Sequence, residues 1–475
     1  MTTLVPKYEL TGTGTVNRAI NLKFAETVSA GDFGVTANGT TDDTSALQSA
    51  LTYAGNNGCL LILPAGNIKV TSALTFSVVP TGSGLSASIQ GQGQSATLIN
   101  YSGNSNINVL TVTGNYAEVI HLSGFAINNT GTSTGSNGFV INKIYGSYFS
   151  DLLAYKFSYG FSLSDTNSNK FTKVTAQNNS TGFSMAIGSG GQSYPNLNDF
   201  DCCNILNNTA YGVYITNGTN NTFRSCNFGQ NVSSGSGATI RMDQEYGGNG
   251  GGFSLVENCY FEGNQVTDFL ATCNGPGSYV FVNNSFNKLG GSTNVTHHII
   301  LDASPLGSGT NLQNNLCMLG NTFAALNGYT GSNSPISLLY GTGGYTNFTI
   351  FDTNVYELKT ETPSYAIPAT AINYDKSGTT NKVVTLNFTG SDTTGTLKNF
   401  PITVTSRDQN FVKADMQIPI GGQLQISGDG LQNANVTTTQ KNAISGATAG
   451  LVVFDTTLGK LCVYTGSAWQ TITSS

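Results

Sequence analysis

A loose repeat that begins near residue 120 constrains this chain more than any other feature of its sequence. In the clearest copies an apolar residue is followed by others three and five positions later, and an asparagine lies three positions beyond, at Asn179, Asn208 and Asn231. The steps between copies run from 22 to 37 residues, and a period of roughly 20 to 50 residues is typical of a solenoid, a propeller or a repeat array. We place the first apolar position of the copies at Leu122, Phe149, Phe171, Phe200, Phe223, Val256, Phe281, Met318 and Phe351.

Each copy has the composition of short strands separated by turns. Gly and Asn interrupt the apolar stretches, no helical period is present, and neither a Trp-Asp nor a Leu-rich signature occurs. Only 9% of the residues are charged, against about 25% in an ordinary domain, so the surface must consist largely of Ser, Thr, Asn and Gly. The pattern predicts an all-β chain, folded as a right-handed parallel β-helix in which one repeat makes one coil.

One convincing helix precedes the repeat, over residues 43–54. Its apolar residues share one face, Asp and Thr are frequent at its start, and Gly55 or Gly58 ends it. A solenoid needs its open hydrophobic end covered, so this helix is predicted to cap the first coil of a β-helix that spans residues 31–365.

After about residue 365 the repeat stops. Residues 385–388, 402–405 and 422–426 have the pattern of ordinary strands, which predicts a small β-sandwich-like domain over 366–437. Residues 438–475 are predicted to form a C-terminal β-hairpin.

Charge and motifs exclude several classes of function. With 19 Lys and Arg against 25 Asp and Glu, the net charge of −6 offers no basic footprint for a nucleic acid. The longest apolar run has five residues, far fewer than the roughly 18 of a membrane span, and no secretory signal is expected. We expect no cofactor and no metal, because the sequence has no phosphate loop, no His-x-His and no Cys-x-x-Cys, and because Asp199 with Asp201 is a weak basis for a calcium site.

Aligning the repeats places three charged residues in one column. The residue that follows each first apolar position points outward, because neighbours alternate across a strand. On three consecutive coils this residue is Asp201, Arg224 and Glu257. The two carboxylates would lie roughly 9 to 10 Å apart by the strand spacing, and inverting glycosidases hold their acid and base about 6.5 to 9.5 Å apart. A polar sheet face also places an arginine between carboxylates to avoid like-charge repulsion, so a structural role remains open.

Residues 199–262 contain six of the 25 acids, about twice the chain average. A glycine-rich insert over residues 241–252 adjoins the column and is expected to close over a groove. Glu257 is our first choice for the acid and Glu262 the second. The candidate catalytic residues are Glu257, Glu262, Asp201, Asp243 and Glu245, and the candidate substrate-binding residues are Arg224, Arg241, Tyr246 and Tyr260.

Three cysteines, Cys203, Cys226 and Cys259, share an inward column. We predict that they are reduced, small buried hydrophobes and not nucleophiles, because no histidine falls in the matching column. His297 and His298 precede an apolar strand and are predicted to be structural.

The segment DFGVTANGTTDDTSALQ at 32–48, followed by LILPAG at 61–66, closely resembles the start of pectate-lyase-like β-helices in phage tailspikes and capsule depolymerases. Residues 17–29 look like the neck that joins such spikes to the virion, so residues 1–30 are expected to form a neck or N-terminal segment. Residues 449–469 resemble short hairpins at the C-termini of phage tail proteins. The resemblance implies a homotrimer that is attached to the phage tail or baseplate through its N-terminus.

This resemblance also implies a function. The chain would be a tailspike depolymerase, part of the virion, that hydrolyses glycosidic bonds of a bacterial surface polysaccharide, either capsule or O-antigen, outside the host. The superfamily also contains lyases and non-catalytic binders. A lyase would use Arg224 or Arg241 to neutralise a uronate, and an adhesin would hold glycan without cleaving it.

Overall fold

The computed structural model describes residues 7–8, 11–16, 18–20, 23, 26–78, 86–116, 119–188, 194–232, 237–243, 253–265, 267–272, 277–287, 298–303, 312–325, 336–340, 346–358, 372–374, 390–391, 397–398 and 435–473. The chain divides into two compact units, Met1–Val412 and Lys413–Ser475.

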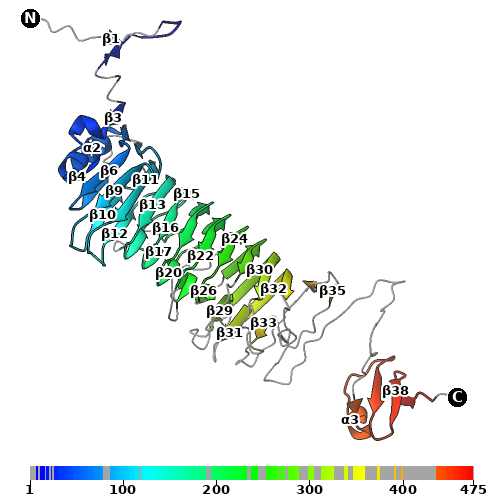
Figure 1. Cartoon of the computed structure of the whole chain (residues 1–475). Coiled ribbons are helices and arrows are strands. Elements are labelled where there is room, and N and C mark those ends of the chain that lie inside the picture. Colours follow the sequence, from blue (N-terminus) through cyan, green and yellow to red (C-terminus); the bar gives the residue numbers. More distant parts are fainter. Residues whose placement is uncertain are drawn as a thin grey trace, which may run out of the picture. The chain divides into compact units, whose positions relative to one another are not determined.

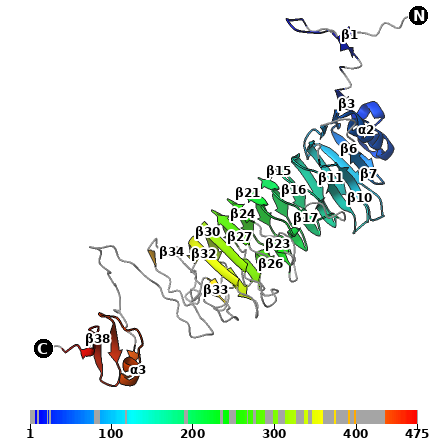
Figure 2. The same cartoon turned by 180° about the vertical axis from the view of Figure 1, so that it is seen from behind.

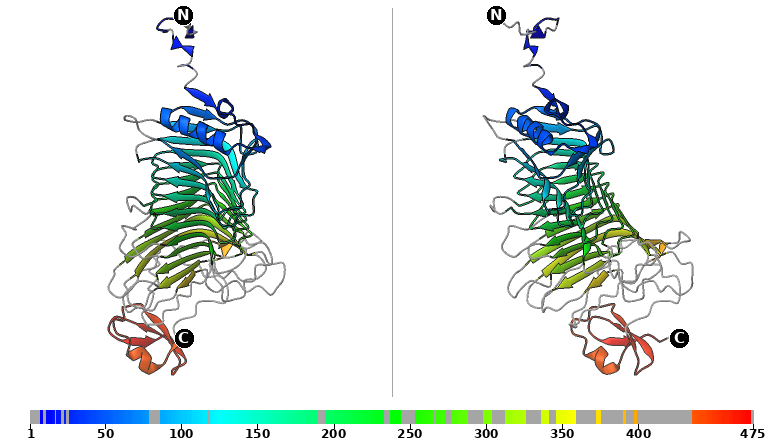
Figure 3. Two further views of the ribbon diagram at one scale, coloured as in Figure 1. Left: turned by 90° about the vertical axis from the view of Figure 1, so that its left-hand side faces the viewer. Right: turned by 60° about the vertical axis from the view of Figure 1, so that its left-hand side comes forward.

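The first unit is a parallel β-helix, whose coils follow one another along a single axis from α2 (Thr44–Asn57) onward (Figures 1 and 3). Each complete coil has three sides. The first and second sides are short strands separated by a residue with positive φ, for example Cys202 (φ 54°). The third side is an 11-stranded sheet, several strands of which are labelled from behind in Figure 2.

The first-side strands that matter below are β15 (Lys170–Thr172), β18 (Asp199–Asp201), β21 (Thr222–Arg224), β24 (Phe253–Glu257) and β27 (Gly277–Val282). The second-side strands are β16 (Thr175–Gln177), β19 (Asn204–Leu206), β22 (Asn227–Gly229), β25 (Tyr260–Glu262) and β28 (Ser285–Asn287). Longer strands β11 (Ile120–Asn129), β13 (Tyr148–Tyr155), β30 (Leu312–Ala325) and β32 (Thr346–Leu358) run through both sides.

The third side consists of β7 (Leu74–Ser77), β10 (Asn108–Thr113), β12 (Asn137–Asn142), β14 (Tyr159–Ser164), β17 (Thr181–Ala186), β20 (Tyr211–Thr216), β23 (Ala238–Asp243), β26 (Thr267–Thr272), β29 (Ile299–Ala303), β31 (Ile336–Tyr340) and β33 (Ile372–Tyr374). The N-terminal coils contain β3 (Thr27–Ser29), β4 (Asn38–Asp42), β5 (Leu60–Ile62), β6 (Gly66–Val70), β8 (Ala87–Gln90) and β9 (Thr97–Tyr101), with a 3-10 turn at Ala30–Phe33.

The predicted repeat register is confirmed from Leu122 to Met318, where each first apolar residue pairs with that of the next coil. The last position is wrong by one residue, because Met318 pairs with Asp352 and Phe351 pairs with Cys317. The alignment of the repeats by counting therefore fails at this last coil.

Stacked phenylalanines fill the core. The rings of Phe149, Phe171, Phe200 and Phe223 follow one another at centroid distances of 4.7, 4.8 and 4.9 Å, and all four side chains are buried. These distances equal the spacing of parallel strands, about 4.8 Å, so the register of the backbone and the stacking of the rings support each other.

Buried asparagines form ladders at two corners of the coils. Asn179, Asn208 and Asn231, the residues visible in the repeat, each pass a hydrogen bond to the next, with Nδ2 to Oδ1 distances of 3.2 and 2.9 Å. Each Oδ1 also accepts from a backbone N–H of the preceding coil, for instance Asn179 N to Asn208 Oδ1 at 3.1 Å. The ladders therefore satisfy backbone groups that the turns would otherwise bury without a partner.

The capping helix is confirmed as α2, which packs on β7 and extends three residues further than predicted. Gly58 ends it in the left-handed region (φ 61°). Gly55 lies inside the helix instead, where a β-carbon would fall 2.2 Å from the Ser77 carbonyl oxygen. Asp43 does not cap the helix with its side chain; its carboxylate accepts hydrogen bonds from the N–H groups of Thr36 and Ala37.

The first unit also contains two short antiparallel pairs. β1 (Lys7–Tyr8) pairs with β2 (Arg18–Ala19), and β34 (Gly390–Ser391) pairs with β35 (Leu397–Lys398). The second unit is a four-stranded sheet of β36 (Asn435–Val436), β37 (Val452–Asp455), β38 (Lys460–Tyr464) and β39 (Trp469–Thr471), with helix α3 (Thr438–Asn442). Most of the predicted sandwich at 366–437 lies outside the described residues, and the domain boundaries stay a prediction.

Candidate functional site

The predicted column of charged residues exists. Asp201 on β18 pairs with Arg224 on β21, and Arg224 pairs with Glu257 on β24. On these strands the charged residues flank the buried Phe200, Phe223 and Val256, so their side chains project outward from the first side.

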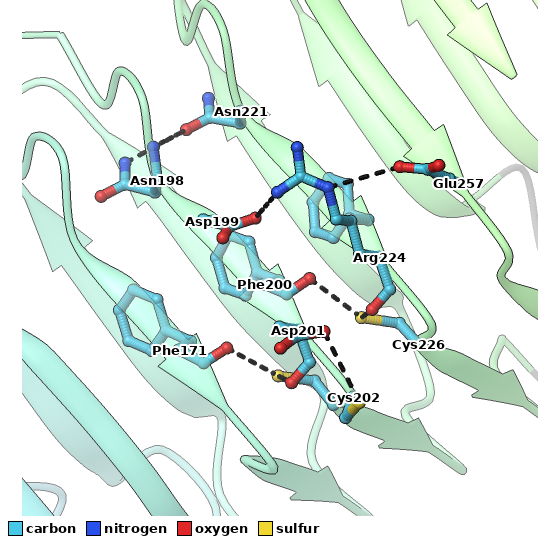
Figure 4. A network of polar contacts seen from close by, with 12 residues as sticks. Phe171, Asn198, Asp199, Phe200, Asp201, Cys202, Asn221, Arg224, Cys226 and Glu257 are labelled. Atoms are coloured by element: carbon cyan, nitrogen blue, oxygen red, sulfur yellow. Dashed lines mark hydrogen bonds and ion pairs between the residues drawn. The ribbon is translucent and has the colours of Figure 1, made fainter. Parts of the chain in front are cut away.

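The guanidinium of Arg224 joins two carboxylates (Figure 4). Its Nη1 donates to Asp199 Oδ1 at 2.9 Å and its Nε to Glu257 Oε2 at 3.3 Å. The exposed fractions of the three side chains are 44% for Arg224, 27% for Asp199 and 33% for Glu257. We call Asp199, Asp201, Arg224 and Glu257 the Arg224 cluster.

Asp199, not Asp201, is the ion-pair partner that the sequence did not reveal. Its register neighbour on the next coil is Thr222, so a count along the column does not connect it to Arg224. The arginine side chain is long enough to reach the diagonal position. Asp201 lies beside Cys202, whose Sγ is 3.5 Å from Asp201 Oδ1. By the strand spacing, two coil steps separate these aspartates from Glu257, roughly 10 Å.

Glu262 and Tyr260 lie on the adjoining second side, on β25. The chain turns between Glu257 and Tyr260 at Asn258, which has a positive φ of 52°. Tyr260 is 37% exposed, and its hydroxyl accepts a hydrogen bond from Asn287 Nδ2 at 3.2 Å. Glu262 pairs with Gly229 and Asn287. These two residues therefore share a coil with Glu257 but occupy another side of it.

The prediction that Arg241 and Asp243 belong to a glycine-rich insert closing over a groove beside the charged column is wrong. They are strand residues on β23 of the third side. The alternation of buried Ile240 and Met242 with the two charged residues is a strand pattern, and the glycine run that follows obscured it. Glu245 and Tyr246 lie outside the described residues.

The Asp243 carboxylate is enclosed by donors. Arg241 Nε lies 3.0 Å from both of its oxygens, the hydroxyl of Tyr214 donates at 2.9 Å, and that of Thr272 donates at 3.0 Å. Burial and the hydrogen bond to Asp243 raise the pKa of Tyr214. A carboxylate that accepts from three side chains is suited to holding neighbours in place, which favours a structural role over proton transfer.

The cysteine prediction is confirmed in its geometry. Cys203, Cys226 and Cys259 are buried and free, and their Sγ atoms lie 3.4 to 3.5 Å from carbonyl oxygens of the preceding coil. Burial raises the pKa of the Cys203 and Cys226 thiols well above the ordinary value. A nucleophile requires the thiolate, so this environment disfavours one.

His298 is buried in the core, where its Nδ1 lies 2.6 Å from Asp268 Oδ2 and its ring packs against the stacked rings of Phe286 and Phe323. This position agrees with a structural role, whereas His297 lies outside the described residues. Among the described residues, no group of three or more His, Cys, Asp or Glu could hold a metal ion. No helix in the described part of the chain is long and apolar enough to cross a membrane.

Comparison with known proteins gives the fold. No protein-family model and no curated protein matches this chain. Two similar solved structures are tailspike protein 3 of bacteriophage CBA120 (14% identity, TM-score 0.55, covering 98% of this chain and 72% of that one) and the gp42 tailspike of Acinetobacter phage vb_AbaP_AS12 (14%, 0.57, 94% and 76%).

A third similar structure is the catalytic unit of the GH87 α-1,3-glucanase of Streptomyces thermodiastaticus (14% identity, TM-score 0.52, covering 77% of this chain and 68% of that one). At such identities the likeness concerns the fold, which is the right-handed parallel β-helix that the repeat predicted.

Proposed function

We propose that this protein is a phage tailspike that binds a bacterial surface polysaccharide, capsule or O-antigen, and hydrolyses its glycosidic bonds. The observation that carries the proposal is the Arg224 cluster, an outward group of three carboxylates and one arginine, on a fold that phage tailspikes and a glucanase share. Fold alone does not determine activity, so the cluster provides the chemical support.

In this proposal Glu257 is the general acid and Asp201 the general base. Their separation of roughly 10 Å, by two strand spacings, approaches the distance that leaves room for a water molecule in inverting hydrolysis. Glu257 would protonate the leaving oxygen while Asp201 takes a proton from the attacking water. Because Glu257 accepts a hydrogen bond from Arg224, the acid role requires the guanidinium to turn toward Asp199 or the substrate when polysaccharide binds.

The test is incubation of the purified full chain with capsule and O-antigen from a susceptible host. We expect new reducing ends and shorter polymers from the native protein, and at least a hundredfold slower release from Glu257→Gln, since acid catalysis contributes about 10² to 10⁴. A matched control is Glu26→Gln, which removes another arginine-paired carboxylate, 2.6 Å from Arg18, remote from the cluster. Full activity in Glu257→Gln would remove Glu257 from the mechanism.

The same assay separates the alternatives. A lyase would leave an absorbing double bond in its products, whereas a hydrolase leaves saturated ends. One observation favours a non-catalytic adhesin: Arg224 forms ion pairs with both Asp199 and Glu257. A charged ladder with a purely structural role would show the same ion pairs. It predicts saturable binding with no change in polymer length.

Assembly and location belong to the same proposal. We place the protein in the virion as a homotrimer that is attached to the phage tail through the N-terminal residues and acts on the outside of the host. Light scattering on the purified chain is expected to give three times the monomer mass of 49.6 kDa, and a monomeric mass would contradict the trimer.

A further inference from the structure

An exposed aromatic residue lies on the first side of the β-helix, two coils before Asp199. Tyr148 on β13 is 51% exposed. Its register partner on β11 is His121, and the next outward residues on the two strands are serines, Ser150 and Ser123, which pair with each other. Half of this side chain is exposed beside a histidine and two serines, so it offers an aromatic surface with hydroxyl groups nearby to a ligand.

This ring belongs to the same outward surface as the Arg224 cluster. His121, Tyr148, Lys170 and Asp199 pair in turn on four consecutive coils. By the strand spacing, the backbone of Tyr148 lies roughly 10 Å from that of Asp199 and roughly 19 Å from that of Glu257. A continuous line of exposed side chains thus leads along the axis from the ring to the proposed catalytic residues.

The surroundings of Tyr148 hold its position. The next residue, Phe149, is part of the buried stack. The ring of His121 meets that of Tyr148 in an edge-on contact, at 5.0 Å and 69°. Three residues earlier, Tyr145 packs against Tyr116 at 5.0 Å, and the Tyr116 hydroxyl lies 3.4 Å from Asp165 Oδ2. A ring on a rigid strand is pre-organised to receive a flat apolar ligand.

We propose that Tyr148, oriented by His121, is a sugar-binding subsite, and that the polysaccharide lies along the β-helix axis from Tyr148 over Lys170 to the Arg224 cluster. This inference rests on the proposed function and adds a place and a direction for the polymer. A pyranose ring presents an apolar C–H face that stacks on tyrosine, while its hydroxyl groups match the Ser and Lys side chains around it. A protein partner would instead require a contiguous apolar patch, which the paired serines interrupt.

The test compares Tyr148→Ala, Tyr148→Phe and Tyr159→Ala. Tyr159 is the matched control, because it is also an exposed tyrosine (38%) but lies on β14 of the third side. For Tyr148→Ala we expect KM on the intact polymer to rise about three- to tenfold, which corresponds to the energy of one aromatic contact. Its kcat and melting temperature should match those of the native protein, and Tyr148→Phe and Tyr159→Ala should retain the native KM.

Binding is measured separately by calorimetry, with Glu257→Gln as the background so that the polymer stays intact. If the native protein binds but never cleaves, the proposed hydrolysis fails while the Tyr148 subsite is still tested by the loss of affinity in Tyr148→Ala. If the native protein cleaves and Tyr148→Ala shows unchanged KM and affinity, the subsite is overturned and the proposed function stands. If no surface polysaccharide binds, both are overturned.

Discussion

At the scale of single residues, the ion pairs of the Arg224 cluster contribute little to the stability of the fold. Arg224 is 44% exposed, and its two partners are 27% and 33% exposed. Ion pairs this accessible contribute about 0 to 1 kcal/mol, because water screens the charges and fixing long side chains costs entropy. A ladder that existed only for stability would therefore gain little from this arrangement.

This difference can be measured with Arg224→Gln. We expect the free energy of unfolding to change by less than about 1 kcal/mol, while polysaccharide binding or cleavage falls at least tenfold because the two carboxylates lose the cation between them. Denaturant titration and the reducing-end assay report the two quantities on the same sample. A large loss of stability with native activity would mean that the cluster serves the fold.

At the scale of elements, the buried asparagine ladders connect successive coils through hydrogen bonds. Asn208 is an example of the number of hydrogen bonds that one ladder residue makes. Its Oδ1 accepts from Asn179 N and Nδ2, and its own Nδ2 donates to Ala176 O and to Asn231 Oδ1. All of these groups are buried, so none can turn to bulk water when a partner is lost.

Asn208→Ala is therefore expected to lower the free energy of unfolding by about 3 kcal/mol or more, since each buried group left without a partner costs about 1 to 3 kcal/mol. Asn204→Ala is the control from the same coil, because Asn204 projects outward from β19 and is half-buried. We expect that change to stay within about 0.5 kcal/mol. Equal unfolding midpoints for the two variants would show that water replaces the lost amide.

At the scale of the whole molecule, the second unit has its own polar centre. Asp455 is buried and accepts hydrogen bonds from Lys441 Nζ at 2.8 Å, from Thr438 Oγ1 and from two backbone N–H groups of the turn after β37. Burial alone would raise the pKa of Asp455, but the bonds from Lys441, Thr438 and the backbone outweigh it and lower this pKa to about 2.

The sign of the pH effect follows from this shift. A carboxyl whose pKa is lower in the folded unit stabilises it above the ordinary value of 3.8, and this stabilisation is lost as the pH falls toward about 2. Trp469 is the only tryptophan of the chain and lies in this unit, so its fluorescence follows the second unit within the full protein. We expect the denaturant concentration at the unfolding midpoint to decrease as the pH is lowered from 4 to 2. The Asp455→Asn variant should be less stable than the native protein at neutral pH, and its midpoint should change less on acidification. A midpoint that stays constant over this range would contradict the assignment.

The sequence by itself determined the β-helix, because its inward residues must recur at each coil whatever the turns do. That requirement left Phe200, Phe223, Cys203 and Cys226 in recognisable columns and placed Asp201, Arg224 and Glu257 beside one another. The rule is local and periodic, so a count of positions suffices until a single residue slips, as it does between Met318 and Asp352.

Only the tertiary structure decided which outward side chains meet. Arg224 bonds Asp199 across a diagonal that no count along one column reveals. Arg241 and Asp243, close in sequence to Glu257, lie on another side of the coil, and Tyr148, about 110 residues earlier, shares the surface of the cluster. The physical reason is that contacts between outward side chains depend on side-chain length and on the position of the turns in each coil. Unlike the core residues, these two properties do not have to repeat from one coil to the next.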